Sequence, residues 1–152
     1  MSDFAVRRWT TGKRLGDIMA MVHAAFREFE PPSGVLKETA ADLAARQRRG
    51  LILVAMDGER FIGSVFAARK GDAFYLTRLA TAPAWRKRGV GRALMAAAEQ
   101  EASASGAARL TLRVRQTLPG NLAYFRRLGF VVTGEGREDG RTPFHTMERM
   151  LA

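Results

Sequence analysis

The sequence contains no cysteine, which excludes disulfide frameworks, cysteine nucleophiles and zinc sites built on thiolates. Its two histidines, His23 and His145, are far apart in the chain and do not suggest a histidine metal cluster, so we expect no metal. Long hydrophobic runs are also missing: the longest are Leu51–Met56 and Ala93–Ala98, far short of the roughly 18 residues that span a bilayer. Because residues 1–8 also lack the apolar region of a signal peptide, we expect a cytoplasmic protein with no membrane partner.

What the sequence does have is an excess of positive charge. Lys and Arg number 25, against 15 Asp and Glu, which gives a formal net charge of +10. Such a charge favours polyanionic partners: nucleic acid, a phospholipid surface or a phosphate-rich cofactor. The 152 residues, 47% of them hydrophobic and 26% charged, have the length and composition of one globular domain spanning 1–152.

Hydrophobic periodicity predicts a chain that alternates between strands and helices. Apolar residues at helical spacing, ended by glycine or proline, predict helices over 13–29, 37–49, 90–105 and 119–128. Alternating or continuous apolar runs predict strands over 4–9, 51–56, 60–68, 73–80, 110–114, 130–133 and 144–150. The charged, glycine-rich residues 135–141 are predicted to form a hairpin loop.

This order of elements predicts an α/β fold, with a mixed, twisted β-sheet that has helices on both faces. It runs strand, two helices, three strands, helix, strand, helix and two strands. The strand–helix–strand unit over 74–114 is expected to form a parallel, right-handed crossover.

One segment has the features of a pyrophosphate site. A strand ends near Thr81, a short basic loop follows, and a helix opens at Gly89 and Gly91. Several N–H groups at such a helix start lack an intrahelical partner, and the aligned peptide dipoles add about half a positive charge. The two glycines keep side chains away, so a phosphate can approach the backbone. Four basic side chains add charge at the same place: Arg86, Lys87, Arg88 and Arg92.

A Gly-x-Gly pair by itself also suits a simple tight turn between a strand and a helix. The segment is not a P-loop, because the Gly-Lys-Ser/Thr ending is absent. It is not a dinucleotide-binding fingerprint either, because Leu94 fills the third glycine position and no acidic residue closes the next strand. A pyrophosphate cradle that follows an antiparallel meander is the interpretation that is left.

These residues resemble a known family. Arg86-x-x-Gly89-x-Gly91 resembles the acetyl-CoA signature of the GNAT N-acetyltransferase superfamily. Leu79–Pro83 is similar to its strand-end pattern, and Leu128-Gly129-Phe130 to its late joint between a helix and a strand. The resemblance covers nearly the whole chain and is strongest from Tyr75 to Phe130. It implies direct transfer of an acetyl group from acetyl-CoA to a primary amine of a small molecule or peptide.

The resemblance also implies where the cofactor is held. In this family pantetheine lies like an extra strand between two parallel strands that splay apart, and an N–H near Leu79 would face the thioester carbonyl. The implied cofactor-binding residues are Leu79, Ala80, Thr81, Arg86, Lys87, Arg88, Gly89, Val90, Gly91 and Arg92. Asn121 is a further candidate for binding pantetheine, although it also suits a helix cap. Homodimers formed through the last strands are common in the family.

The acid and the base are where the sequence departs from the family pattern. The family often places a tyrosine, the proton donor to the thiolate, at the position that Phe125 occupies here. Tyr124 is the neighbouring candidate, about 100° away around the helix. The fourth strand offers no carboxylate as a base. Glu28, Glu30 and Glu38 flank the loop where acceptors usually enter in this family, and they are candidates that would act through water, but each also suits a solvated helix charge.

Two further side chains are candidates for the acceptor site. Arg78 stands one residue before the end of the cofactor strand, where it would meet a carboxylate of the acceptor, although it also suits a solvated surface position. His145 on the last strand is a candidate for lining the acceptor cleft, whereas His23 falls near the apolar stripe of its helix and suits a core histidine.

Two other functions fit the same residues. A catalytically silent CoA-binding sensor would explain Phe125 and the missing base. A nucleic-acid-binding module would explain the +10 charge, but the chain lacks a recognisable pair of DNA-reading helices, and its aromatic residues lie mostly at apolar-periodic positions.

Overall fold

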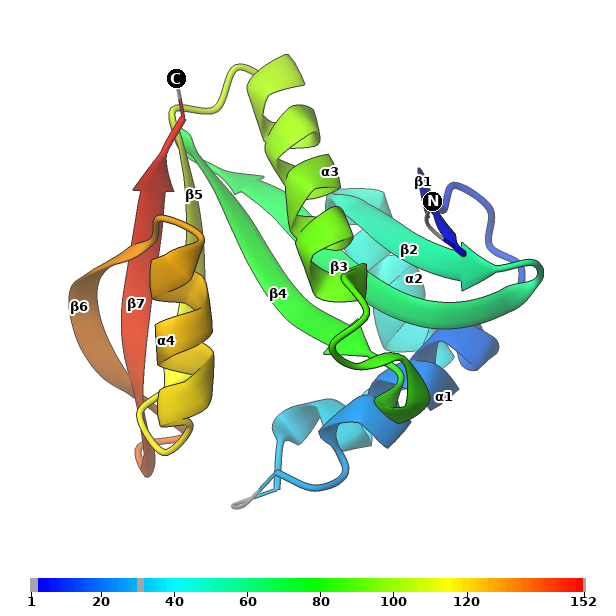
Figure 1. Ribbon diagram of the computed structural model, residues 1–152, viewed down its shortest axis with the longest axis horizontal. Helices are drawn as coiled ribbons and strands as arrows, with labels where there is room; N and C mark the ends of the chain where they lie inside the picture. Colours follow the sequence, from blue (N-terminus) through cyan, green and yellow to red (C-terminus); the bar gives the residue numbers. More distant parts are fainter. Residues whose placement is uncertain (1–2, 30–31, 152) are drawn as a thin grey trace. The chain divides into compact units, whose positions relative to one another are not determined.

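The computed structural model describes residues 3–29 and 32–151 (Figure 1). The chain forms two compact units and passes between them more than once. Unit 1 comprises Met1–Ala68 and Leu76–Glu101, and unit 2 comprises Arg69–Tyr75 and Ala102–Ala152. Each unit therefore contains two separate segments of the chain, and strand β4 (Ala73–Thr81) contributes residues to both.

The order of strands and helices confirms the predicted order. The other strands are β1 (Ala5–Arg8), β2 (Leu51–Asp57), β3 (Arg60–Lys70), β5 (Arg109–Arg115), β6 (Val131–Glu138) and β7 (Thr142–Met150). The helices are α1 (Leu15–Phe26), α2 (Ala40–Arg49), α3 (Val90–Ala104) and α4 (Pro119–Arg127), with short 3₁₀ helices η1 (Gly34–Lys37) and η2 (Pro83–Trp85).

The strands form one mixed sheet in the order β1-β2-β3-β4-β5-β7-β6. β4 and β5 are parallel and pair Ala73–Tyr75 with Arg109–Thr111, which confirms the parallel arrangement predicted for the crossover. The pairs β1–β2, β2–β3, β5–β7 and β6–β7 are antiparallel. The α/β class and the mixed sheet are therefore as predicted.

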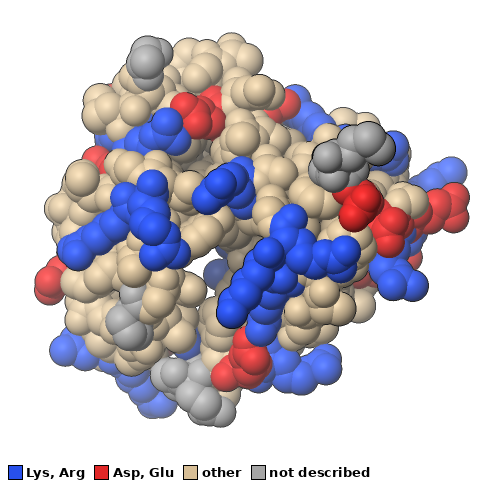
Figure 2. Space-filling view, viewed as in Figure 1, with Lys and Arg blue, Asp and Glu red and all other residues tan. Residues whose placement is uncertain are grey.

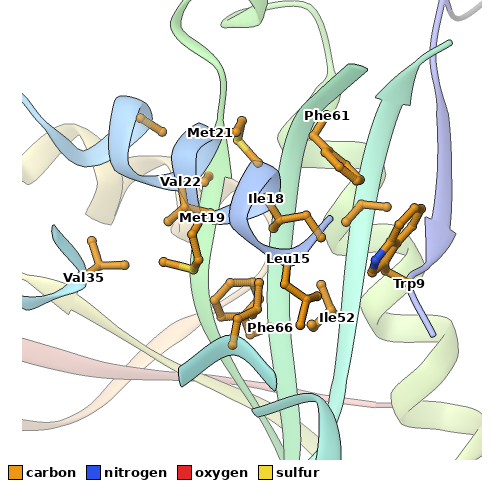
Figure 3. Packing of buried hydrophobic residues seen from close by; sticks show 14 of the residues in the cluster. Trp9, Leu15, Ile18, Met19, Met21, Val22, Val35, Ile52, Phe61 and Phe66 are labelled. Atoms are coloured by element: carbon orange, nitrogen blue, oxygen red, sulfur yellow. The ribbon is translucent and has the colours of Figure 1, made fainter. Parts of the chain in front are cut away.

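The core of unit 1 lies where α1 and α2 cover one face of β2 and β3. Leu15, Ile18 and Val22 recur at helical spacing along α1 and are buried. They belong to one apolar cluster with Ile52 of β2 and Phe66 of β3 (Figure 3). Burial of a large apolar side chain contributes about 1.5–3 kcal/mol relative to exposure, so this cluster is what attaches the two helices to the strands.

Helix α3 covers the opposite face of these strands. A Cβ added at Gly63 of β3 would lie 2.6 Å from Cγ1 of Val90 and 3.0 Å from Cδ1 of Leu94, so α3 fills the space above this glycine. Side chains alternate along a strand, so Phe66 points to the α1–α2 side and Gly63 to the α3 side. Unit 1 thus has helices on both faces, as predicted (Figure 1).

Two predicted helices are longer than the observed ones. The first begins at Leu15, since Arg14 has a left-handed backbone with φ of 61°, and it ends at Phe26. The second begins only after Thr39, whose side chain accepts from the N–H of Asp42 in a capping box. The residues just before this cap form η1 instead of continuing α2.

The hairpin loop predicted over 135–141 is wrong for its first half. β6 continues to Glu138 and pairs with β7 as far as Thr142, so the connection shrinks to residues 139–141. Charged and glycine residues have low strand propensity, which misled the prediction. A Cβ at Gly136 would lie 2.5 Å from Cζ of Phe144, so close packing on β7 requires glycine at this place in a strand.

Candidate functional site

β4 leads into a loop in which two residues have a left-handed backbone, with positive φ. The N–H of Ala82 donates to the carbonyl of Ile62 at 2.8 Å, which anchors the start of the loop to β3. After η2, φ is 63° at Lys87 and 86° at Gly89, while Arg88 between them is outside the left-handed region. Such alternation turns successive N–H groups toward one side and forms a concave site for an anion.

Helix α3 begins directly after this loop. The N–H of Ala93 donates to the carbonyl of Gly89 at 3.0 Å, so the amides of Val90, Gly91 and Arg92 precede the first helical hydrogen bond. The helix dipole adds about half a positive charge at the same end. A Cβ at Gly89 would meet nothing within 4 Å, so the space above it is open. The residues present therefore fit a diphosphate group.

The basic side chains of the loop have different partners. Nη1 of Arg86 lies 2.5 Å from Oε1 of Glu28, and its Nη2 donates to the carbonyl of Ala25 at 3.1 Å. Arg86 thus ties the loop to the end of α1. The guanidinium of Arg88 lies over the ring of Trp85, 4.1 Å from its centroid.

A cavity of about 530 Å³ opens beside the start of α3. Its lining combines aromatic, cationic and small side chains, namely Asp3, Phe4, Val6, Trp85, Arg88, Gly89, Arg92, Ala93 and Ala96. Lys and Arg side chains are also spread over much of the molecular face seen in Figure 2, where Asp and Glu form smaller patches. Two of the predicted basic residues, Arg88 and Arg92, therefore line this cavity together with Gly89, and the acidic Asp3 lines it as well.

Arg78 of β4 is held by an acidic partner. Its backbone φ is 57°, which is rare for a residue with a side chain. Nε of Arg78 donates to Oε1 of Glu38 at 3.0 Å, and Nη2 donates to Oε2 at 3.3 Å. The side chain of Arg78 is 29% exposed and that of Glu38 17% exposed. The solvated-surface interpretation of both residues is therefore wrong.

A second arginine shares the same carboxylate. Nη2 of Arg46 on α2 donates to Oε2 of Glu38 at 2.9 Å, and its Nη1 donates to the hydroxyl of Thr77 at 3.3 Å. His23 of α1 donates from Nε2 to the backbone carbonyl of Glu38 at 2.9 Å. Burial by itself would raise the pKa of Glu38, but the hydrogen bonds and charges of Arg78 and Arg46 outweigh it and hold that pKa below its ordinary value.

Comparison with known proteins decides the family. A family model described as an acetyltransferase (GNAT) domain matches residues 21–151. The chain belongs to the GNAT acetyltransferase family. The GNAT resemblance seen in Arg86-x-x-Gly89-x-Gly91 is therefore confirmed for the chain as a whole.

Solved structures share the same fold. The chain is similar to the ribosomal-protein-S18-alanine N-acetyltransferase of Escherichia coli, with 22% identity, 98% and 94% of the two chains covered and a TM-score of 0.79. It is also similar to Ard1 of Thermoplasma volcanium, with 18% identity, 99% of each chain covered and a TM-score of 0.83. A third similar structure is the PaiA N-acetyltransferase of Thermoplasma acidophilum in complex with coenzyme A. Its sequence identity is 18%, 99% of each chain is covered and the TM-score is 0.82. A search of curated protein sequences gives no match.

The strand end that the sequence resemblance assigns to the cofactor is partly accessible in this chain. Ala80 is buried, while Leu79 and Thr81 on either side of it are half-buried. Lys87 is exposed in the loop that follows. No helix in the described part of this GNAT chain is both long and apolar enough to cross a bilayer.

The GNAT residues predicted on α4 lie in unit 2. Phe125 is buried and packs edge-on against Phe130, 5.8 Å between centroids, whereas Tyr124 is half-buried. The position where the resemblance implies a tyrosine therefore holds a buried phenylalanine, and the phenol of Tyr124 lies beside it. Leu118 is the N-cap of α4 and makes no side-chain cap hydrogen bond, so Asn121 lies within the first turn and the capping interpretation is wrong.

The other candidate bases have unequal surroundings. Glu28 is 63% exposed at its side chain and pairs with Arg86, and Glu30 lies outside the described residues. His145 is half-buried, and its Nδ1 lies 3.9 Å from Oε1 of Glu135. His23 is hydrogen-bonded, as expected of a satisfied histidine, but it is only half-buried, so its predicted place in the core is wrong.

Sequence reasoning missed the grouping of Arg46, Thr77, Glu38 and Arg78. Arg46 follows Glu38 by eight residues, and Arg78 follows it by 40. Residues so far apart in the sequence form no local pattern, and they come together only because α2 and β4 lie close to each other in the folded chain. Two successive polar residues in an otherwise apolar strand, Thr77 and Arg78, were the one available signal.

Proposed function

We propose that this protein is an acetyl-CoA-dependent N-acetyltransferase that transfers the acetyl group directly to a primary amine of a small molecule or peptide. The observation that carries the proposal is the loop before α3, where φ alternates at Lys87 and Gly89 and the first amides of the helix follow. Membership of the GNAT family supports the same chemistry. The proposal includes a location in the cytoplasm and a homodimer, the assembly that the sequence resemblance implies.

The loop residues bind the cofactor in this proposal. The backbone amides from Lys87 to Arg92 hold the diphosphate, with Arg88 and Arg92 adding charge and Arg86 fixing the loop. Backbone groups of Leu79, Ala80 and Thr81 pair with the pantetheine arm, to which Asn121 contributes from α4. Acetyl-CoA supplies the acetyl thioester. An N–H near Leu79 stabilises the charge that develops on the carbonyl oxygen, and a donor of this kind typically contributes about 10²–10³ in rate.

Proton transfers complete the proposed reaction. Tyr124 donates a proton to the leaving thiolate in place of the family tyrosine. The attacking amine must be neutral, and the lowered pKa of Glu38 makes that carboxylate a weak proton acceptor. The amine proton therefore leaves through water in this proposal, and Glu38 has a different role, argued below.

Thermal unfolding tests whether acetyl-CoA binds. We expect acetyl-CoA to raise the melting temperature, because a ligand that binds only the folded state stabilises it by mass action. Gly91→Asp should abolish the shift, since it places a carboxylate among the amides that face the diphosphate. Gly12→Asp is the matched control: it makes the same change of charge where a Cβ would meet nothing within 4 Å, and it should keep the shift. No shift of the unmodified protein at millimolar acetyl-CoA would contradict the proposal.

Thiol release over a panel of amines then separates an enzyme from a sensor. Turnover with any amine supports the transferase. A melting shift without turnover on the whole panel would instead favour a CoA-binding sensor. The proposed homodimer is tested separately: light scattering measures the molar mass of the protein as it elutes from a size-exclusion column.

A further inference from the structure

Among residues 3–29 and 32–151, the cluster around Glu38 is not balanced in charge. Two guanidinium groups, of Arg46 and Arg78, share one carboxylate, so the group carries a net charge of +1. The side chains of the two arginines are only 30% and 29% exposed, so water screens this charge poorly. Half-buried charges in proteins are normally paired, and a surplus cation in such a place favours an anionic ligand.

Within the part of the chain that the structure describes, the cluster also retains hydrogen-bond donors that its contacts do not use. Each guanidinium has five N–H groups. Two bonds from Arg78 and one from Arg46 go to Glu38, and one more from Arg46 goes to Thr77. These contacts leave part of each planar fork available, and such a fork matches the two oxygens of a carboxylate.

The position of the cluster relates it to the acceptor and not to the diphosphate. Arg46 stacks over Phe66, with 5.6 Å to the ring centroid, on the side of the strands that α1 and α2 cover. The glycine loop leads into α3, which packs on the opposite side above Gly63. Arg78 directly precedes Leu79, whose N–H the proposed mechanism aims at the thioester carbonyl. An anion held by Arg46 and Arg78 would therefore lie on the α1–α2 side of the strands, opposite the side where α3 would hold the diphosphate.

The backbone at Arg78 fits a positioned side chain. A φ of 57° is unfavourable for a residue other than glycine and persists where the surroundings hold it in place. The two-pronged contact with Glu38 provides that hold. The carbonyl of Glu38 is in turn fixed by His23, so the carboxylate itself has a defined place.

We propose that Arg46 and Arg78 form a carboxylate-binding subsite and that the acceptor is a small amine that carries a carboxylate. Glu38 is a positioning residue: it aligns both guanidinium groups and neutralises one of their two charges, so that the remaining +1 matches one carboxylate. This inference rests on the proposed function for the amine, but binding of the carboxylate can be measured without turnover.

The first experiment measures binding. N-acetylglycine and N-acetyl-leucine, which are products of such acceptors, are titrated against their uncharged amides by NMR, with the arginine side-chain N–H signals as the readout. We expect the acids to bind about tenfold or more tightly than the amides, as charge-assisted hydrogen bonds imply. Equal binding of acids and amides, or no binding of the acids at millimolar concentration, would overturn the subsite.

Variants then assign the preference to this pair. Arg78→Met and Arg46→Met should each remove most of the preference for the acids. Arg48→Met is the control, since Arg48 is exposed on the same helix and the substitution changes the net charge equally. Loss of the preference in Arg48→Met as well would mean that the overall field, and not this pair, selects the anion, and would overturn the assignment.

A kinetic experiment links the subsite to the reaction. Amino acids and their amides are compared as acceptors, and Arg78→Met should raise KM for the acids about tenfold while leaving kcat and the affinity for acetyl-CoA unchanged. An equal loss on acids and amides would show a merely structural role and overturn the inference. Failure of acetyl-CoA to bind would contradict the proposed function, whereas the NMR titration tests the subsite independently.

Discussion

At the scale of single residues, Glu38 shows how a charge acquires its role from its partners. Sequence alone offers a glutamate in the first turn of a predicted helix, which is an ordinary solvated position. In the folded chain its two oxygens accept from Arg46 and Arg78. Charge-assisted hydrogen bonds of this kind contribute more than those between neutral groups. Removal of the carboxylate would leave two guanidinium groups facing each other without compensation.

The pH dependence of stability should reflect this contact. The pKa of Glu38 in the folded protein lies below its ordinary value of 4.5, so its stabilisation is complete above that value and is lost as pH falls through the folded-state pKa. We expect Glu38→Gln to lower the free energy of unfolding by about 1–3 kcal/mol near neutral pH and by much less in acid. Urea unfolding at a series of pH values measures the difference. Glu59→Gln, at an exposed turn position, is the control. A penalty for Glu38→Gln that persists unchanged in acid would contradict this account.

At the scale of elements, α3 joins the core of unit 1 to the glycine loop. Its apolar residues Val90 and Leu94 are buried above Gly63, while its first amides form the proposed anion site. The same contact that seats the helix therefore sets the direction of those amides. Periodicity predicted α3 to within one residue at its C-terminal end, because a long alanine-rich helix between two glycine breaks is a strong local signal.

Gly63→Ala tests this seating. The added Cβ would lie 2.6 Å from Val90, and also 3.1 Å from the carbonyl oxygen of Ala80, so α3 must shift outward. We expect a loss of about 1–3 kcal/mol in the free energy of unfolding and a smaller melting shift with acetyl-CoA. Gly16→Ala in α1 is the contrasting control: its Cβ would meet nothing within 4 Å, and the protein should gain up to about 1 kcal/mol. Unchanged stability of Gly63→Ala would show that α3 is seated differently.

At the scale of the whole molecule, the net charge of +10 has more than one consequence. It attracts anions in general, and part of it is concentrated at the two proposed binding sites, in the loop before α3 and in the pair Arg46 and Arg78. A diffuse positive field binds nucleic acid without sequence preference, because each phosphate contact merely releases counterions.

Salt separates this general attraction from a specific site. We expect any binding to duplex DNA to be independent of sequence and to fall by orders of magnitude between low and physiological salt. Binding of acetyl-CoA should fall much less, because backbone amides and the shape of the site also contribute. Gel shifts and melting shifts over one salt series make the comparison. A gel shift that persists at high salt on a defined sequence would revive the nucleic-acid function.

The sequence by itself determined the order of elements, the α/β class and the place of the glycine loop. These depend on local signals: apolar periodicity, the glycine pair at 89 and 91, and the basic residues beside it. It failed where the local signal was weak or misleading, as in β6, where glycine and charge predicted a loop but packing on Phe144 gives a strand.

Only the tertiary structure decided which distant side chains meet. The contact of Glu38 with Arg78 spans 40 residues of sequence and joins a loop to a strand. Its energy depends on a separation of about 3 Å and on burial, and neither quantity is encoded within a few residues of either partner. The tertiary structure likewise placed Phe125 in the core of unit 2 and left Tyr124 half-buried, because the packing of α4 on Phe130, and not the residue type, selects the face that is buried.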